Sequence, residues 1–212
     1  MRCPVLPYSR LVRWDRFFDD LEDQLASEWE AERAALDSEA ERLRLSRVQL
    51  SARLAPLAEG GGQARVVSLD LADGATLRAR VTGVGADCVA LGLVDGPGGA
   101  VIVPFASIAT IGMPHADLLR TARPAPSRST LSERITFGFV LRDLVRRRAG
   151  VSIQLLSGRA LAGTIDRAGA DHLDIAVHDR GAPRRAGSVA AYRLVPFGTI
   201  AWVRADEAPA VP

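Results

Sequence analysis

Two stretches of this chain carry nearly the same pattern: "VSLDLADGATLRARVTGVGADCVALGL" at residues 67–93 and "VSIQLLSGRALAGTIDRAGADHLDIAV" at residues 151–177. They align without a gap at an offset of 84 residues. After an eight-residue insertion in the second copy, "IVPFASIATI" (102–111) faces "LVPFGTIAWV" (194–203). Self-similarity at a fixed offset indicates duplication. The chain therefore contains two copies of one domain.

Apolar residues alternate with polar or small ones within each copy. Val67, Leu69 and Leu71 share one face of their segment, and this period of two predicts a strand with one buried face. Gly74 and Gly158 close hairpin turns between the first two strands of each copy. Three more strands follow, the fourth ending in Val-Pro-Phe. Five short antiparallel strands are expected to curl into a small barrel, because closure removes exposed edges.

A helix is expected before each barrel. Residues 132–150 offer Ser132 as N-cap, a stripe of Ile135, Phe139 and Arg142, and Gly150 as the stop. Before the first barrel, apolar residues recur at spacings of three, four or seven: Trp14, Phe18, Leu21, Leu25, Trp29, Leu36, Ala40, Leu43, Leu50 and Leu54. This pattern predicts one amphipathic helix from about residue 14 to about residue 54, on the order of 60 Å long.

The expected domain order follows from these elements. It comprises a flexible N-terminus (1–13), an acidic amphipathic helical arm (14–39), a first helix–barrel domain (40–112), a Pro/Ser-rich linker (113–131), a second helix–barrel domain (132–205) and a tail (206–212).

The composition is that of a globular protein. Of 212 residues about half are apolar and a quarter charged, and no apolar run approaches the roughly 18 residues of a membrane span. The N-terminus lacks the apolar core of a signal peptide. Cys3 and Cys88 make no disulfide framework. We expect a cytoplasmic protein with reduced thiols and no contact with membranes.

Charge is unevenly distributed although the net charge is only +2. Residues 15–41 hold 11 acids against two arginines, and residues 120–204 hold 15 arginines against six acids. The acidic arm and the basic half can attract each other, within a chain or between chains, and can compete with an anionic ligand.

The order of one helix and five strands, with "LLSGRALAGTIDRAGADHLDIAV" in the second copy and "VPFASI" and "VPFGTI" in the fourth strands, resembles the Sm-like (LSm) family. The resemblance covers residues 40–112 and 132–204 and omits the arm. It implies small bent barrels that associate edge to edge, in many members into rings that bind RNA. The expected fold class is thus mainly β with helices: two tandem Sm-like five-stranded barrels, each preceded by a helix, plus a long N-terminal amphipathic helix.

The turn after the second strand departs from the family's RNA-binding pattern, Asp-x-apolar-Asn. Asp87 and Asp171 keep the Asp, but Ala90 or Asp174 stands at the Asn position. An alanine cannot read a base, and an ionised aspartate only accepts hydrogen bonds and repels phosphate. The usual base-binding pocket is therefore expected to be missing.

The family's second motif departs as well. It usually places a basic pair after its strand, and here Pro104-Phe105 and Pro196-Phe197 stand in that place. Phe197 could stack a base, or could plug the barrel mouth, as buried phenylalanines usually do.

Candidate RNA-binding residues lie in the second copy: Arg146, Arg147, Arg148, Arg159, Asp171, His172, Arg180, Arg184, Arg185 and Phe197. The three arginines at 146–148 end a helix, where cations also suit the helix dipole. The three at 180–185 belong to the insertion, a type of loop that often contacts phosphates. Arg159 sits in a turn, where a purely solvent-facing role is the alternative.

The N-terminal arm is rich in aromatics, with five of the chain's eleven in the first 29 residues. We expect its stripe to bind a partner through Trp14, Phe18, Leu21, Leu25 and Trp29. The stripe could pack on the chain's own barrels or form a coiled coil or helix-in-groove contact with another chain. The length of the helix favours contact beyond its own barrel.

No pattern of catalytic residues is present in the sequence. His172 and His178 lie roughly 20 Å apart on one expected strand at about 3.3 Å per residue, too far to share a metal, and no phosphate-binding loop or nucleophile elbow occurs. We expect no enzyme, cofactor, metal or small-molecule substrate. Two hypotheses remain: an RNA-binding module with little base readout, or an assembly scaffold that lost RNA binding and docks or self-associates through its helix and barrel edges.

Overall fold

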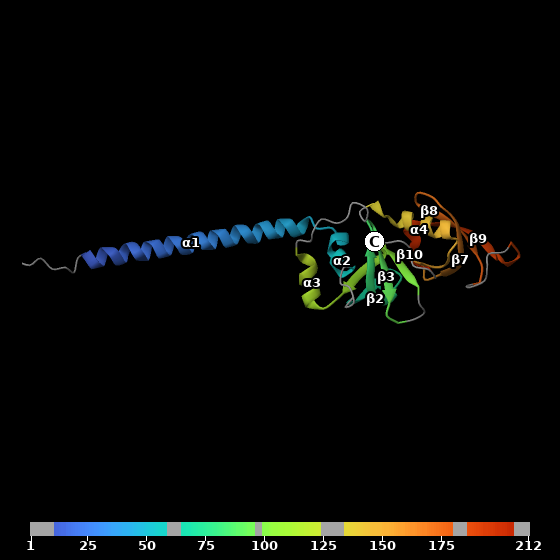
Figure 1. Cartoon of the computed structure of the whole chain (residues 1–212), viewed down its shortest axis with the longest axis horizontal. Coiled ribbons are helices and arrows are strands. Elements are labelled where there is room, and N and C mark those ends of the chain that lie inside the picture. Colours follow the sequence, from blue (N-terminus) through green and yellow to red (C-terminus); the bar gives the residue numbers. More distant parts are fainter. Residues whose placement is uncertain (1–10, 59–64, 96–98, 124–133, 180–185, 206–212) are drawn as a thin grey trace, which may run out of the picture. The chain divides into compact units, whose positions relative to one another are not determined.

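The computed structural model describes residues 11–58, 65–95, 99–123, 134–179 and 186–205, with side chains of the first helix from Phe17 onward. The chain separates into two compact units, residues 1–48 and 49–212. The first unit holds helix α1 (Leu11–Ser46), and the second holds all ten strands and the other helices (Figure 1). The expectation of a β-rich fold with helices is confirmed at this level.

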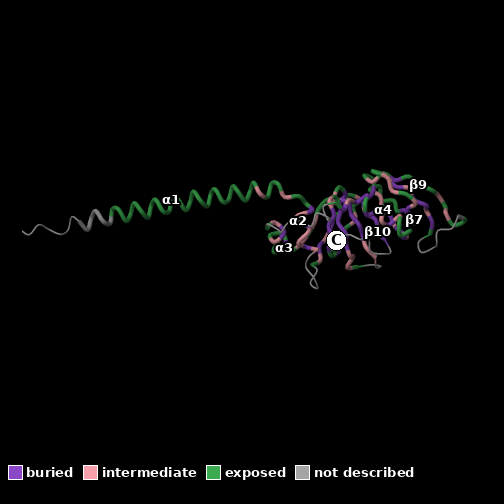
Figure 2. The backbone as a smooth tube through the Cα atoms, turned by 45° about the horizontal axis from the view of Figure 1, so that its top comes forward, coloured by how far each residue is buried: buried purple, intermediate pink, exposed green. Residues whose placement is uncertain are grey.

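Helix α1 is 36 residues long, about 54 Å at 1.5 Å per residue, and nearly all of its described residues are exposed (Figure 2). The prediction of one helix over residues 14–54 is wrong at its C-terminal end. The backbone N–H groups of Arg47 and Val48 donate to carbonyls three residues back, which tightens and ends the helix. A separate helix, α2 (Leu50–Ala58), then buries Leu54 and Leu57 in the second unit.

The two copies each supply five strands. The first copy forms β1 (Val66–Leu71), β2 (Thr76–Val84), β3 (Cys88–Leu93), β4 (Ala100–Pro104) and β5 (Ile108–Gly112). The second forms β6 (Gly150–Leu155), β7 (Ala160–Ala168), β8 (His172–Val177), β9 (Ala191–Pro196) and β10 (Ile200–Ala205). Short 3₁₀ turns, η2 (Phe105–Ser107) and η5 (Phe197–Thr199), join the last two strands of each copy, and η4 (Ala186–Ser188) precedes β9.

The ten strands of the described residues form one open antiparallel sheet, in the order β5-β1-β2-β3-β4-β10-β6-β7-β8-β9. Each half repeats the same internal order, and the registers agree, since Leu69 faces Leu77 and Ile153 faces Leu161. The duplication seen in sequence is thus a duplication of structure. Two separate closed barrels, however, are not confirmed. Instead β4 of the first copy pairs with β10 of the second, so each covers an edge of the other copy.

This junction between β4 and β10, called the seam below, joins the interiors of the two copies. Side chains alternate along β4: Val101 and Val103 belong to the first copy's core, whereas Ile102 belongs to the second copy's core. In return, Trp202 of β10 packs against the first core. The hydroxyl of Ser107 donates to the Ala201 carbonyl oxygen across the seam at 2.6 Å. The seam is therefore part of both cores.

Each copy carries a helix on its second strand, α2 on β2 and α4 (Phe137–Arg147) on β7. Thr136 is the N-cap of α4, because its hydroxyl accepts from the Phe139 N–H at 3.2 Å; the expected N-cap Ser132 lies outside the described residues. The expected stop at Gly150 is three residues late, since α4 ends at Arg147 and Gly150 begins β6.

The expected stripe through Phe139 is also wrong, because that side chain is exposed. The residues that α4 buries are Phe137, Gly138, Val140, Leu141 and Leu144. They follow the same helical spacing, rotated by one position, so the spacing was read from the wrong starting residue.

A short helix, α3 (His115–Ala122), occupies the start of the expected linker. Its buried Asp117 pairs with Arg65 and, at 3.4 Å, with Arg120. Arg53 of α2 donates to the Thr121 hydroxyl at 3.2 Å. Arg53 thus ties α3 to α2, and Arg65 ties it to the start of β1, so this segment is packed rather than a free connection.

The first copy's Gly-Ala-Asp turn holds the start of α4. The Asp87 carboxylate accepts from the Phe137 N–H at 2.6 Å, and the Ala86 N–H donates to the Ile135 carbonyl oxygen at 2.8 Å. The equivalent Asp171 has a side chain that is 90% exposed. The aspartate side chain of this turn thus holds a helix terminus in the first copy only, although the second copy's turn also contacts α4, through the Gly169 carbonyl oxygen and Arg142.

We predict that Asp87→Ala lowers the free energy of unfolding by about 1–2 kcal/mol, because it removes the acceptor of a helix N-terminal N–H. The matched change Asp171→Ala, at the equivalent turn, should stay within about 0.5 kcal/mol of wild type. Urea unfolding followed by circular dichroism measures both. Equal losses in the two variants would contradict this assignment.

Candidate functional site

The two ends of the sheet, β5 and β9, each pair with a strand on one side only among the described residues. On β9, Tyr192 and Leu194 are each 65% exposed. Their counterparts on β4 are Ala100 and Ile102, and Ile102 is fully buried by the seam. The same strand position is therefore buried on β4, where the seam covers it, and exposed to solvent on β9.

A pocket of about 360 Å³ lies beside β9. Its wall is mostly apolar and includes Leu155, Leu161 and Val195, while Arg159 and Arg193 also line it. The matching place in the first copy is not empty, because Trp202 packs against the core there that contains the counterparts of Leu155 and Val195. The pocket of the second copy thus corresponds to the region of the first copy that Trp202 occupies at the seam.

The β5 end presents a charged group instead of an apolar one. The Asp70 carboxylate accepts from the Thr110 hydroxyl at 2.6 Å and from the Thr76 hydroxyl at 2.8 Å. These two hydrogen bonds, Thr110 first, lower the pKa of Asp70 below its usual value. All three residues are exposed, so this end carries an ionised acceptor at neutral pH.

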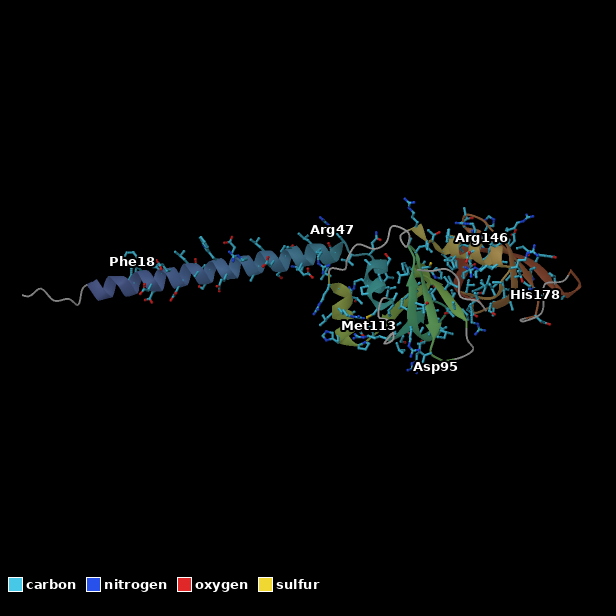
Figure 3. All side chains as sticks on the ribbon, viewed as in Figure 1. Phe18, Arg47, Asp95, Met113, Arg146 and His178 are labelled. Atoms are coloured by element: carbon cyan, nitrogen blue, oxygen red, sulfur yellow. The ribbon has the colours of Figure 1, made fainter. Side chains whose placement is uncertain are left out.

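Helix α1 carries the other exposed apolar surface. Four of its five expected partner-binding residues are described and exposed: Phe18, Leu21, Leu25 and Trp29, with Phe18 marked in Figure 3. The side chain of Trp14 lies outside the described residues. Leu36 and Leu43 continue the exposed stripe toward the end of the helix.

Of the expected RNA-binding arginines, two already have protein partners. Arg146 (labelled in Figure 3) and Arg147 pair with Asp143 at 3.1 and 2.8 Å. Arg148 is the left-handed C-cap of α4, and Arg159 lines the pocket beside β9. The three arginines of the insertion, Arg180, Arg184 and Arg185, lie outside the described residues.

Three other expected RNA-binding residues come together where β8 begins and β9 ends. The His172 ring and the Asp171 carboxylate share a hydrogen bond of 2.8 Å, which lowers the pKa of Asp171. The Phe197 N–H donates to the Asp171 carbonyl oxygen at 2.7 Å. The half-buried ring of Phe197 meets Phe137 of α4 edge to face, with centroids 5.6 Å apart. Phe197 thus packs against the helix of its own copy.

His178 is engaged in the fold. Its Nδ1 lies 3.0 Å from the Asp179 carbonyl oxygen and its Nε2 lies 2.9 Å from the Thr164 hydroxyl. A carbonyl only accepts, so in the neutral ring Nδ1 carries the proton and Nε2 accepts from Thr164. Within the described part of the chain, no group of three acidic, His or Cys side chains could hold a metal, and no helix is both long and apolar enough to cross a bilayer.

Several residues at the sheet ends were not expected from the sequence: Asp70, Thr76, Thr110, Tyr192, Arg193 and Leu194. The sequence signal for them is the difference between the copies. Trp202 of the second copy stands against Thr110 of the first, and Val101 of the first copy stands against Arg193 of the second, at positions that the rest of the repeat treats as equivalent.

No family model, curated protein or solved structure matches this chain. The surfaces described above are therefore the basis for inferring function.

Cys88 is buried at the start of β3, and burial, together with Asp87, raises the pKa of its thiol to about 12. At about pH 8 its thiolate fraction is roughly one in ten thousand. We predict that iodoacetamide leaves Cys88 unmodified in the native protein and modifies it fully in denaturant. Peptide mass spectrometry resolves this site. Rapid native labelling of Cys88 would contradict its buried placement.

Proposed function

We propose that this chain is a non-enzymatic assembly module of the Sm-like kind, in which two joined domains associate with further copies through β5 and β9. Helix α1 of each chain serves as a docking element for a partner. The observation that carries the proposal is the seam between β4 and β10. The repeated strand order of the two halves supports the resemblance.

The seam joins the fourth strand of one copy to the fifth strand of the other. What remains at the two ends of the sheet is a fifth strand, β5, and a fourth strand, β9. These are the two strand types that already pair within the chain. A contact between β9 of one chain and β5 of the next is heterologous, so repetition gives a ring if it closes and a filament if it does not.

The seam also supplies a register for the outer contact. Ile102 faces Val203 and Val101 faces Arg204 across the seam. Transferred to the outer strands, this places Leu194 opposite Ile111 and Arg193 opposite Gly112 of a second chain. Covering the 65% of Leu194 that is exposed contributes about 1–2 kcal/mol.

A hydrogen bond of the seam has an outer counterpart as well. Thr199 stands where Ser107 stands in the first copy, and its hydroxyl donates only locally, to the Pro196 carbonyl oxygen at 2.8 Å. In the transferred register, the Ala109 carbonyl oxygen of the second chain lies where Ala201 lies in the seam. A hydrogen bond between chains, from the Thr199 hydroxyl to the Ala109 carbonyl oxygen, would therefore repeat the Ser107–Ala201 hydrogen bond of the seam.

Binding of RNA is less well supported than assembly. Ala90 and Asp174 replace the base-reading residue, and Asp143 neutralises part of the charge of Arg146 and Arg147. A surface with fewer available cations releases fewer counterions on binding a phosphate backbone. Assembly needs none of these residues.

Sedimentation velocity of the full chain tests the proposal. We predict masses that are multiples of 22.6 kDa and rise with concentration. Leu194→Glu should shift the chain to single copies, because it places a charge in the outer contact. Leu36→Glu, a matched change on α1, should leave the masses unchanged. A single-copy mass at every concentration would overturn the proposal, and dissociation by Leu36→Glu alone would assign self-association to α1.

A second measurement addresses RNA. Fluorescence anisotropy of a mixed-sequence single-stranded RNA with the full chain should show no saturable binding even at low salt. Tight binding at low salt that falls steeply near physiological salt would favour the RNA-binding alternative, because such a dependence reports phosphate contacts.

A further inference from the structure

Four positions at the seam carry uncharged side chains. Trp202 covers the first core, and two residues of the first copy near that edge, Ala75 in the β1–β2 turn and Val101 on β4, are uncharged. Gln154 pairs with Trp202 on the neighbouring strand β6. The indole thus meets a surface of the first copy that is uncharged at these positions, while Arg204 of β10 lies opposite Val101.

All of these positions differ at the outer ends. Thr110 stands in place of Trp202 and Asp70 in place of Gln154 on the β5 side. On the β9 side, Arg159 and Arg193 replace Ala75 and Val101, and both line the open pocket. At these positions the seam joins two uncharged surfaces. The β5 end of the sheet carries an acidic residue there, and the β9 end carries two basic residues.

We infer that Arg159 and Arg193 of one chain bind Asp70 of a second chain, so that charge makes the outer contact specific for a second copy. This inference rests on the proposed self-association, and it identifies what recognises what at that contact. The pocket beside β9 is the receiving site, and the Asp70–Thr110 pair on β1 and β5 is the group received.

The register of the seam makes the contact geometrically feasible. Arg193 falls opposite Gly112, which has no side chain to block it, and Gly112 pairs with Ser68 on β1 while Thr110 pairs with Asp70. Strand β1 lies one strand beyond β5, so about 10 Å separates it from β9. An extended arginine and an aspartate together span this distance, and the arginine stems cover the apolar pocket wall.

Asp70 retains capacity for this contact. A carboxylate has about four acceptor positions, and Thr76 and Thr110 occupy two of them. The two threonines hold the carboxylate in place before any partner arrives, which favours a geometrically defined pairing with a guanidinium group.

The same charges disfavour the wrong pairings. A β9 strand placed against a β10 strand would bring Arg193 opposite Arg204, and like charges directly opposite destabilise a sheet. A β4 strand placed against a β5 strand would leave Asp70 beside Val101 and Ala75, without a cation. Only the seam within a chain and the β9–β5 contact between chains are matched on both sides, so whole chains join head to tail.

Sedimentation velocity of charge-reversed full-length chains tests the inference. Asp70→Arg alone and Arg159→Asp with Arg193→Asp should each weaken self-association about tenfold or more. An equimolar mixture of these two chains should assemble again, because each restores a complementary partner for the other. Asp95→Arg, a reversal of another exposed acid that lies just after β3 and pairs with Arg78, should assemble as wild type does.

A milder variant separates charge from folding. Asp70→Asn keeps the side-chain shape and an acceptor for the threonines, and should assemble more weakly and with less dependence on salt than wild type. Circular dichroism of each variant establishes that it is folded.

The outcomes separate the two proposals. If the wild-type chain assembles and Leu194→Glu abolishes assembly while Asp70→Arg does not, the charge pairing is wrong and the edge contact stands. If the wild-type chain does not assemble, the proposed function fails and the pairing with it. Failure of the mixed chains to assemble would also overturn the pairing.

Discussion

Unpaired backbone groups at strand edges are the constraint on which this structure depends. Each copy ends in two edges, and the seam between β4 and β10 pairs one edge of each copy with the other. The rest of the domain arrangement follows from that pairing. Strand β4 contributes to both cores, Ser107 bonds across the seam, and Asp87 holds the first N–H of the second copy's helix. The two copies therefore form one hydrophobic structure rather than two tethered domains.

Equivalent residues serve different purposes according to which edge they occupy. Ile102 is fully buried and Leu194 is mostly exposed, although both are large aliphatic residues at the same strand position. Asp87 caps a helix, whereas Asp171 bonds the neighbouring His172. Packing inside the chain explains the inner member of each pair completely. The outer Leu194 keeps an exposed apolar side chain that packing within one chain does not use, and the proposed contact between chains would cover it.

The sequence predicted local structure better than long-range pairing. Alternation and the offset of 84 residues give the strands, their turns and the duplication, because each depends on neighbours in the chain. Alternation defines the two faces of a strand but not which edges meet, so one open sheet was read as two barrels. The helix break at Ser46 was missed because Leu50 and Leu54 continue the apolar spacing, yet Leu54 is buried in another unit.

In the proposed assembly, self-association and partner binding would use two chemically different surfaces. Helix α1 combines an exposed apolar stripe with a charge of −9 between residues 15 and 41. Two such helices side by side would bring like charges together, which opposes pairing of α1 with itself and favours a partner of opposite charge. The sheet ends carry the complementary charges that α1 lacks. Edge-to-edge assembly would then multiply the copies of α1 in one particle, and linked weak sites of this kind bind far more tightly together than singly.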